Sequence, residues 1–199
     1  MQGNLSIFGG AMHELQNCGL CLLTLKVNFR RKTVGKGGES WERLPFMTMF
    51  QGSFRNTLDG KGRVAIPARF REAMSGADED RLMVTHFQVS GVPCLEAYAP
   101  RAWQQLVDGL SAGVGAFSQS RTLFETVYLG GVQTCQPDKQ GRILVPQDLR
   151  RRAELEQEVI FLGVGPKFRM FEASAYERVE QAFHELVQNN PDAFRDLGI

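Results

Sequence analysis

The chain has 199 residues, 43% of them hydrophobic, and a net charge of +1 from 23 basic and 22 acidic side chains. This length suits one compact domain or two small ones. A balance this close excludes binding to nucleic acid through overall charge, so such a role needs a local basic patch. No apolar run reaches the ~18 residues that span a membrane, so we expect no membrane partner.

Residues 1–48 differ from the rest of the chain. They are rich in Gly, lack clean periodicity and carry a net charge of +3 from six Lys and Arg against three Glu, which leaves −2 for the remainder. We interpret residues 1–48 as a leader that is disordered or not native, because Met47 and Met49 could each serve as a start. The alternative is a basic arm that supports binding to an anion.

The cysteines give no pattern for a metal site. Cys18 and Cys21 form a lone C-x-x-C without a second pair or a suitably spaced His, and Cys94 and Cys135 stand apart. A zinc site needs about four ligands. We therefore predict reduced thiols, no metal and no cofactor.

A globular pattern begins at Phe50. The sequence predicts a strand up to Leu58, then a turn in which the Asp59 side chain caps and Gly62 supplies a positive φ. Pro67 suits the first position of a helix. The remaining elements expected in this half are a strand over 63–66, a helix over 68–74, strands over 82–84 and 94–98, and a helix from residue 100 to 107.

The same order then recurs. A connecting helix over 111–127 carries an apolar stripe with Leu123 and Val127, which suits either the core or a subunit interface. Strands follow over 132–135, 142–145, 159–162 and 168–171, with a helix over 147–153. We expect Ser174 to cap a final helix, whose apolar face at helical spacing is Tyr176, Val179, Phe183 and Leu186.

One motif therefore occurs twice. Asp59, Gly62, Arg63 and Pro67 recur at a constant offset of 79 as Asp138, Gly141, Arg142 and Pro146. Units near ~40 residues rarely fold alone, so we expect the two halves to share one core. After the first helix the offset shortens to 73, which aligns Tyr98 with Phe171.

Basic side chains surround both turns. Arg55, Lys61 and Arg63 lie in or near the first, and Lys139 and Arg142 in the second. A basic turn with a neighbouring Arg can enter a DNA groove or bind phosphates, and Gly permits close approach of the backbone. The alternative is a solvated turn in which each Arg pairs with its own Asp.

An enzyme is not predicted. Asp59 and Asp138 could form a pseudo-symmetric acid–base dyad, but that chemistry wants a small hydroxyl residue and Gly directly after each Asp. The three histidines are scattered, and no nucleophile elbow, phosphate loop or dinucleotide fingerprint occurs.

The run from Met49 to Pro67 resembles the start of the MraZ family of bacterial transcriptional regulators, and the second motif with Pro146, Leu149 and Arg150 resembles its second half. The resemblance covers about residues 49–199. It implies an α+β fold, mainly β, in which two pseudo-symmetric swapped-hairpin AbrB-like halves share one small β-barrel with flanking helices. The implied boundaries are 53–100 for the first half, 101–128 for connecting helices, 129–172 for the second half and 173–199 for a C-terminal helix and tail.

The resemblance also implies a function. MraZ-like proteins assemble into rings, from octamer to dodecamer, and bind direct repeats in double-stranded promoter DNA upstream of the division and cell-wall gene cluster, which they usually repress. Such a regulator works in the cytoplasm, on the nucleoid. By resemblance the first turn reads DNA, with Lys61 on phosphate, Arg63 on a guanine edge, Asp59 orienting the turn and Gly62 permitting it. Arg55, on the preceding strand, is a further candidate DNA-binding residue.

The second turn departs from this pattern, because Gln140 stands where the first has Lys61. Lys139 and Arg142 form a possible second basic turn, in which Arg142 is partly structural, at a subunit contact. Two rival functions remain. An AbrB-like interaction module of the antitoxin type usually has a disordered toxin-binding end, unlike the helical end predicted here. An enzyme on a double-psi-like barrel would need a polar pocket at the pseudo-twofold axis.

Overall fold

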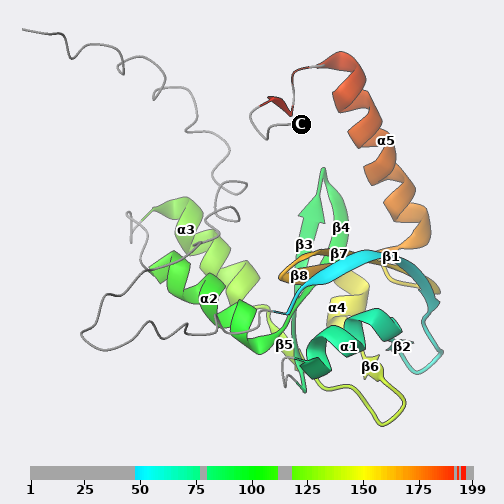
Figure 1. Cartoon of the computed structure of the whole chain (residues 1–199). Helices are drawn as coiled ribbons and strands as arrows, with labels where there is room; N and C mark the ends of the chain where they lie inside the picture. Colours follow the sequence, from blue (N-terminus) through cyan, green and yellow to red (C-terminus); the bar gives the residue numbers. More distant parts are fainter. Residues whose placement is uncertain (1–47, 77–79, 112–117, 191, 193, 196–199) are drawn as a thin grey trace, which may run out of the picture. The chain divides into compact units, whose positions relative to one another are not determined.

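The computed structural model describes residues 48–76, 80–111, 118–190, 192 and 194–195 (Figure 1). All of them belong to one compact unit, Leu44–Ile199. The predicted leader lies outside the described residues except for Thr48, and so do the proposed basic arm and the Cys18–Cys21 pair.

The first half contains β1 (Phe50–Thr57), β2 (Arg63–Ala65), α1 (Ala68–Gly76), β3 (Leu82–Val89) and β4 (Val92–Tyr98). The predicted elements are confirmed, and α1 begins directly after Pro67 as expected for that residue. β3 runs further than predicted. It continues to a two-residue hairpin turn, Ser90-Gly91, whose residues both have positive φ, 51° and 77°, as the turns that match the strand twist require.

The helices α2 (Pro100–Ser111) and α3 (Gln119–Phe124) follow, and α3 runs into a π-helical turn, η2 (Glu125–Leu129). The second half contains β5 (Gln133–Cys135), β6 (Arg142–Leu144), α4 (Gln147–Arg152), β7 (Glu158–Gly165) and β8 (Lys167–Glu172), and α5 (Ala173–Asn189) comes last. The prediction that Ser174 caps α5 is wrong. The cap residue is Glu172, whose carboxylate accepts hydrogen bonds from the backbone N–H groups of Glu156 and Gln157 instead.

The two halves exchange strands. The large sheet has the order β1-β7-β8-β4-β3-β5, and every neighbouring pair is antiparallel. The first strand of each half therefore pairs with the hairpin of the other half, β1 with β7 and β5 with β3. The mainly β, α+β prediction is confirmed. The described strands form an open sheet with β1 and β5 at its edges, and no ladder between them closes the expected barrel.

The repeat is visible in the strand register. β2 and β6 form a separate two-stranded ribbon in which Val64 faces Ile143, its own counterpart at the offset of 79. In the large sheet Glu96 faces Arg169, its counterpart at the shorter offset of 73. The offset between the two halves is shorter after this point partly because α4 has 6 residues where α1 has 9. A local twofold axis thus passes through both ladders.

A phenylalanine-rich core joins the ribbon to the sheet. Phe50, Phe70 and Phe168 are fully buried, and their ring centroids lie 5.0–5.2 Å apart. Val64 and Ile143 enter the same cluster from the ribbon and have no exposed surface. Packing of this kind holds the ribbon, and with it both turns, in a fixed position on the sheet.

The opposite face of the sheet carries α2, η2 and α5 and contains a buried charge. Glu96 has a side chain 1% exposed, and its Oε1 lies 2.7 Å from Lys167 Nζ and 2.8 Å from Arg169 Nε. Its Oε2 accepts hydrogen bonds from the hydroxyls of Tyr98 (3.0 Å) and Tyr128. Burial raises the pKa of Glu96, but the two cations and the Tyr128 hydroxyl outweigh it and hold that pKa below its ordinary value. Glu96 is therefore a charged, fully bonded group at the local twofold axis.

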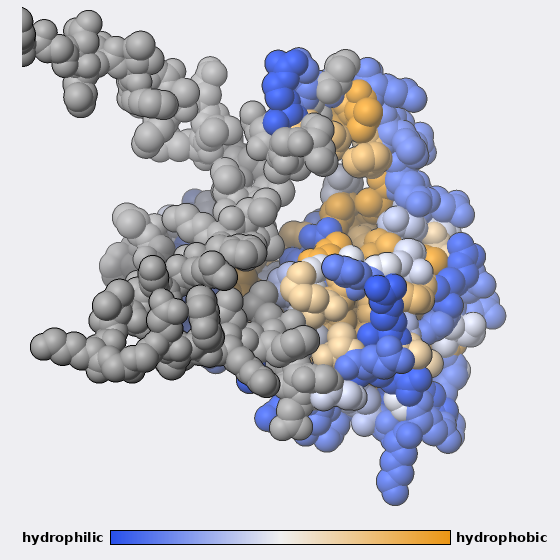
Figure 2. Space-filling model, in the orientation of Figure 1, coloured by the Kyte–Doolittle hydropathy of each residue, from blue (hydrophilic) through white to orange (hydrophobic). Residues whose placement is uncertain are grey.

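The predicted apolar face of α5 is only partly covered. Tyr176 and Val179 pack on the sheet, whereas Phe183 and Leu186, on the same stripe, are 52% and 48% exposed. Figure 2 shows this apolar strip along α5. A groove of about 390 Å³ lies between the strip and the ends of β3 and β7.

Candidate nucleic-acid interface

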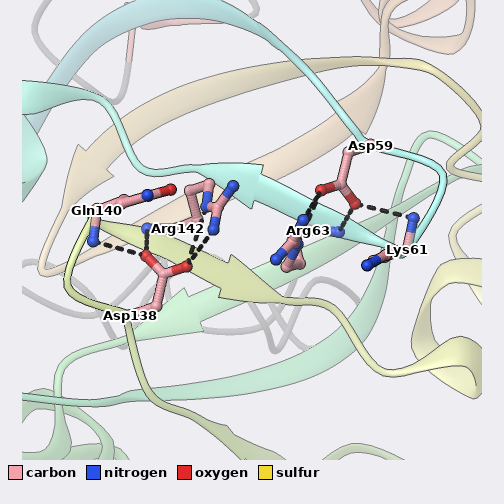
Figure 3. A network of polar contacts seen from close by, with 6 residues as sticks. All are labelled: Asp59, Lys61, Arg63, Asp138, Gln140 and Arg142. Carbon is pink, nitrogen blue, oxygen red and sulfur yellow. Dashed lines mark hydrogen bonds and ion pairs between the residues drawn. The ribbon is translucent and has the colours of Figure 1, made fainter.

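The first turn is built around the carboxylate of Asp59 (Figure 3). The Gly62 N–H donates to the Asp59 carbonyl at 2.8 Å, and Gly62 has φ +80°, which favours glycine. Asp59 Oδ1 accepts the backbone N–H groups of Lys61 and Arg63, both at 2.9 Å. Its Oδ2 lies 2.8 Å from both Nε and Nη2 of Arg63. One side chain thus fixes both the turn and the guanidinium that follows it.

The second turn has the same geometry. Asp138 Oδ1 accepts the N–H groups of Gln140 and Arg142 at 2.9 Å, and its Oδ2 lies 2.9 and 2.8 Å from Nε and Nη2 of Arg142. Gly141 has φ +74°. The turn therefore depends on the Asp, Gly and Arg that the repeat preserves, and it tolerates Gln140 in place of Lys because position 140 contributes only its backbone N–H.

Both carboxylates remain charged. The Arg63 backbone N–H and then its guanidinium lower the pKa of Asp59 to about 2, and the matching groups of Arg142 lower the pKa of Asp138. The predicted alternative, in which each Arg pairs with its own Asp, is thus confirmed as a contact. This ion pair leaves both arginines accessible to a ligand, because the Arg63 and Arg142 side chains are 34% and 29% exposed.

The ribbon presents a defined outer face between the turns. Val64 and Ile143 point into the core, so Arg63, Ala65, Arg142 and Leu144 point outward. The Val145 N–H donates to the Gly62 carbonyl and the Ile66 N–H to that of Gly141, both at 2.9 Å. Each turn therefore lies beside the end of the opposite strand, where the helix of the other half begins.

This crossing brings a further arginine to each turn. A Cβ added to Gly62 would lie 2.6 Å from Arg150 Cζ, and one added to Gly141 would lie 2.5 Å from Arg71 Cδ. Arg150 also donates from Nε to the Val145 carbonyl at 3.1 Å. Arg71 and Arg150 are themselves counterparts at the offset of 79. The predicted site residues omit both. The motif spacing could have identified them as a pair, but only the strand crossing shows which turn each one covers.

The assembled surface is basic although the chain is nearly neutral. The two turns and the crossing arginines hold six cations against two carboxylates, a net +4, in a chain of net charge +1. The members are Asp59, Lys61, Arg63, Arg71, Asp138, Lys139, Arg142 and Arg150. A local basic patch of this kind is what electrostatic attraction of nucleic acid requires of a nearly neutral chain.

The structure does not connect Arg55 with the first turn through any contact in the described part of the chain. Its Nη1 lies 3.0 Å from Glu158 Oε2, and both side chains are exposed. Asn56, its neighbour on β1, has a role that the sequence did not reveal. Its Nδ2 donates to the Ala65 carbonyl at 2.6 Å and so ties the ribbon to the edge of the sheet.

Other kinds of site find little support in the described residues. No group of three or more His, Cys, Asp or Glu there could hold a metal ion. Cys94 and Cys135 are buried thiols, and burial is the main cause that raises their pKa values to about 12 and about 11, so neither is a reactive thiolate. At the twofold axis, where a barrel enzyme would need a polar pocket, Glu96 and its partners bond to one another. None of the helices in this part of the chain has the length and apolarity to cross a membrane.

Comparison with known proteins places the site in a family context. The model of the family described as "MraZ protein, putative antitoxin-like" matches residues 49–124 and 128–197. The chain is 36% identical over 149 residues to proteins named transcriptional regulator MraZ from Burkholderia cenocepacia, Burkholderia lata and Burkholderia vietnamiensis. Each alignment covers 75% of this chain and 99% of the relative.

Proposed function

Because this chain belongs to the MraZ family of transcriptional regulators, we propose that it binds double-stranded promoter DNA sequence-specifically and represses its own division and cell-wall gene cluster. It acts in the cytoplasm, on the nucleoid. The observation that carries the proposal is the rigid ribbon with a basic turn at each end. A two-stranded ribbon fits the major groove of DNA, and turn N–H groups and lysines fit phosphates.

The first turn is the principal reader. Lys61 is exposed and contacts phosphate, while Arg63 is directed at a guanine edge by the hydrogen bond from its Nε and the ion pair from its Nη2 to Asp59 Oδ2. A pre-oriented guanidinium loses less freedom on binding than a free one, which favours affinity as well as specificity. Gly62 keeps the backbone narrow enough for Arg150 to lie over the turn.

The second turn supplies a weaker contact of the same kind. Lys139 and Arg142 repeat the basic pair, but this lysine is one residue closer to the turn's Asp than Lys61 is. Arg71 lies over this turn as Arg150 lies over the first. Phosphate contacts from both ends of the ribbon fix its register on the duplex.

We further propose that the protein is a ring homo-oligomer, from octamer to dodecamer, that binds direct repeats. In each copy the AbrB-like halves 53–100 and 129–172 share one core, the helices 101–128 connect them, and 173–199 form the C-terminal end. One ribbon neutralises few phosphates, and non-specific affinities are then only ~10⁻⁴ to 10⁻⁶ M. Linked sites can raise avidity by roughly 10² to 10⁴. The exposed apolar residues Leu123 and Phe183 support contacts between copies.

The test is an electrophoretic shift assay with the full chain and the region upstream of its own operon, over a series of salt concentrations. We expect saturable binding that Arg63→Ala removes. The slope of log affinity against log salt should become shallower by about 0.9 for each phosphate that Lys61→Ala no longer neutralises. Arg178→Ala is the matched control, because Arg178 is an exposed cation on α5, outside the ribbon and its turns, and should leave binding within a few fold.

Two results would contradict the proposal. Binding that survives Arg63→Ala would remove the first turn from the site. No binding even at low salt, together with a stable complex with another protein from the native cells, would favour the interaction module of the antitoxin type, which the family description also mentions.

A further inference from the structure

A large apolar side chain is exposed in the middle of the basic ribbon. Leu144 is 57% exposed, although its neighbours Ile143 and Val145 are fully buried. It lies opposite Arg63 in the β2–β6 register, and Arg142 lies on the same outer face of the same strand. Packing in the core therefore accounts for the apolar residues Ile143 and Val145, but it does not account for an apolar residue at position 144.

The proposed ligand offers one apolar group at such a position. Phosphates and base edges are polar, and the apolar feature that the major groove presents is the C5 methyl group of thymine. Arginines on both sides of Leu144 would hold the ribbon in that groove. We propose that Leu144 is a specificity-determining residue that contacts a thymine methyl group. This inference rests on the proposed DNA-binding function.

The contact is made by one half of the repeat. The counterpart of Leu144 in the first half is Ala65, which is also exposed on the outer face and lies opposite Arg142. The repeat thus preserves the arginine in both halves, as Arg63 and Arg142, but the apolar residue that follows it is small in the first half and large in the second. Alanine lacks the reach of leucine, so the methyl group is read near the second turn and not at the symmetric position.

Replacing single thymines by uracil tests the inference, because uracil lacks only the methyl group. We would find the bound site by shift assay with the full chain, then measure the Kd for duplexes with one dT→dU change each. Removing one buried methyl costs about four-fold in affinity, from ~0.8 kcal/mol per group. We expect this loss at one or two adjacent positions for the unaltered protein, and no loss at those positions for Leu144→Ala.

Met49→Ala is the matched control, since Met49 is also exposed (48%) but precedes β1, at the end of that strand away from the ribbon. This variant should keep the uracil sensitivity of the unaltered protein. Circular dichroism and sedimentation of each variant confirm that fold and assembly are unchanged.

Three results would overturn the inference. The first is an identical uracil profile for Leu144→Ala and the unaltered protein. The second is that Leu144→Ala binds every duplex more weakly by the same factor and also sediments differently from the unaltered protein, which would make Leu144 a subunit contact. The third is affinity that tracks DNA bending instead of methyl groups, as for a side chain wedged between bases. If the unaltered protein binds no DNA, the proposed function fails as well.

Discussion

Replacing Glu96 by Gln should destabilise the protein strongly while leaving the shape of the side chain intact. The substitution removes the only carboxylate bonded to Lys167 and Arg169 in the described structure and weakens the acceptor for two tyrosine hydroxyls. Breaking a buried ion pair from one side costs about 3–5 kcal/mol. The two cations keep 19% and 26% of their side-chain surface exposed, so water can recover part of the loss and we expect a value near ~3 kcal/mol.

The assay is urea unfolding followed by circular dichroism, with Glu72→Gln, an exposed change on α1, as control. The pKa of Glu96 is lowered in the folded state from 4.5, so its contribution is present above that value and is lost as the pH falls through the lower folded value. The difference between the two proteins should therefore be constant near neutral pH and shrink in acid. A loss below ~1 kcal/mol, or a difference that grows in acid, would refute the reasoning.

Two further predictions concern single groups. Burial, and then the charge of Arg152, lower the pKa of His86 from 6.5, and its Nε2 is buried without a hydrogen bond among the described residues. Stability should therefore fall as the pH drops below about 6.5 and through the lower folded pKa, and His86→Gln should flatten that fall in urea midpoints. Gly62→Ala should cost about 1–2 kcal/mol and displace Arg150, because φ is +80° and the added Cβ meets the guanidinium. Gly60→Ala, with open space around it, should leave the thermal midpoint nearly unchanged, and equal effects of the two would contradict the steric explanation.

The sequence predicts local structure well where one signal dominates. The Asp-x-x-Gly-Arg spacing identifies both turns, and Pro67 marks the start of α1. The prediction for Ser174 fails because a good cap residue does not begin a helix when the chain is already helical at Ala173. The stripe on α5 predicts one packed face, yet only Tyr176 and Val179 pack against the buried cluster, and Phe183 is left exposed. Hydrophobic periodicity shows which side of a helix is apolar, but it does not show how much of that side the rest of the protein covers.

The sequence could not predict the full composition of the site, because strand pairing decides which residues meet there. Arg71 and Arg150 stand in the sequence beside their own turns, and spacing alone assigns each to that turn. Antiparallel pairing of β2 with β6 places each one over the turn of the other half. Glu96 likewise has no sequence signal, because its cations come from β8, in the other half of the chain.

The strand exchange has a consequence for direction along DNA. A symmetric dimer presents identical surfaces after a half rotation, so it cannot distinguish the two ways of lying on a duplex. Here the two symmetric units are one chain, and their outer faces differ: Lys61 corresponds to Gln140, and Ala65 to Leu144. On the proposed function, a single chain would therefore bind an asymmetric DNA sequence in one orientation, and copies bound to successive direct repeats would all have the same orientation.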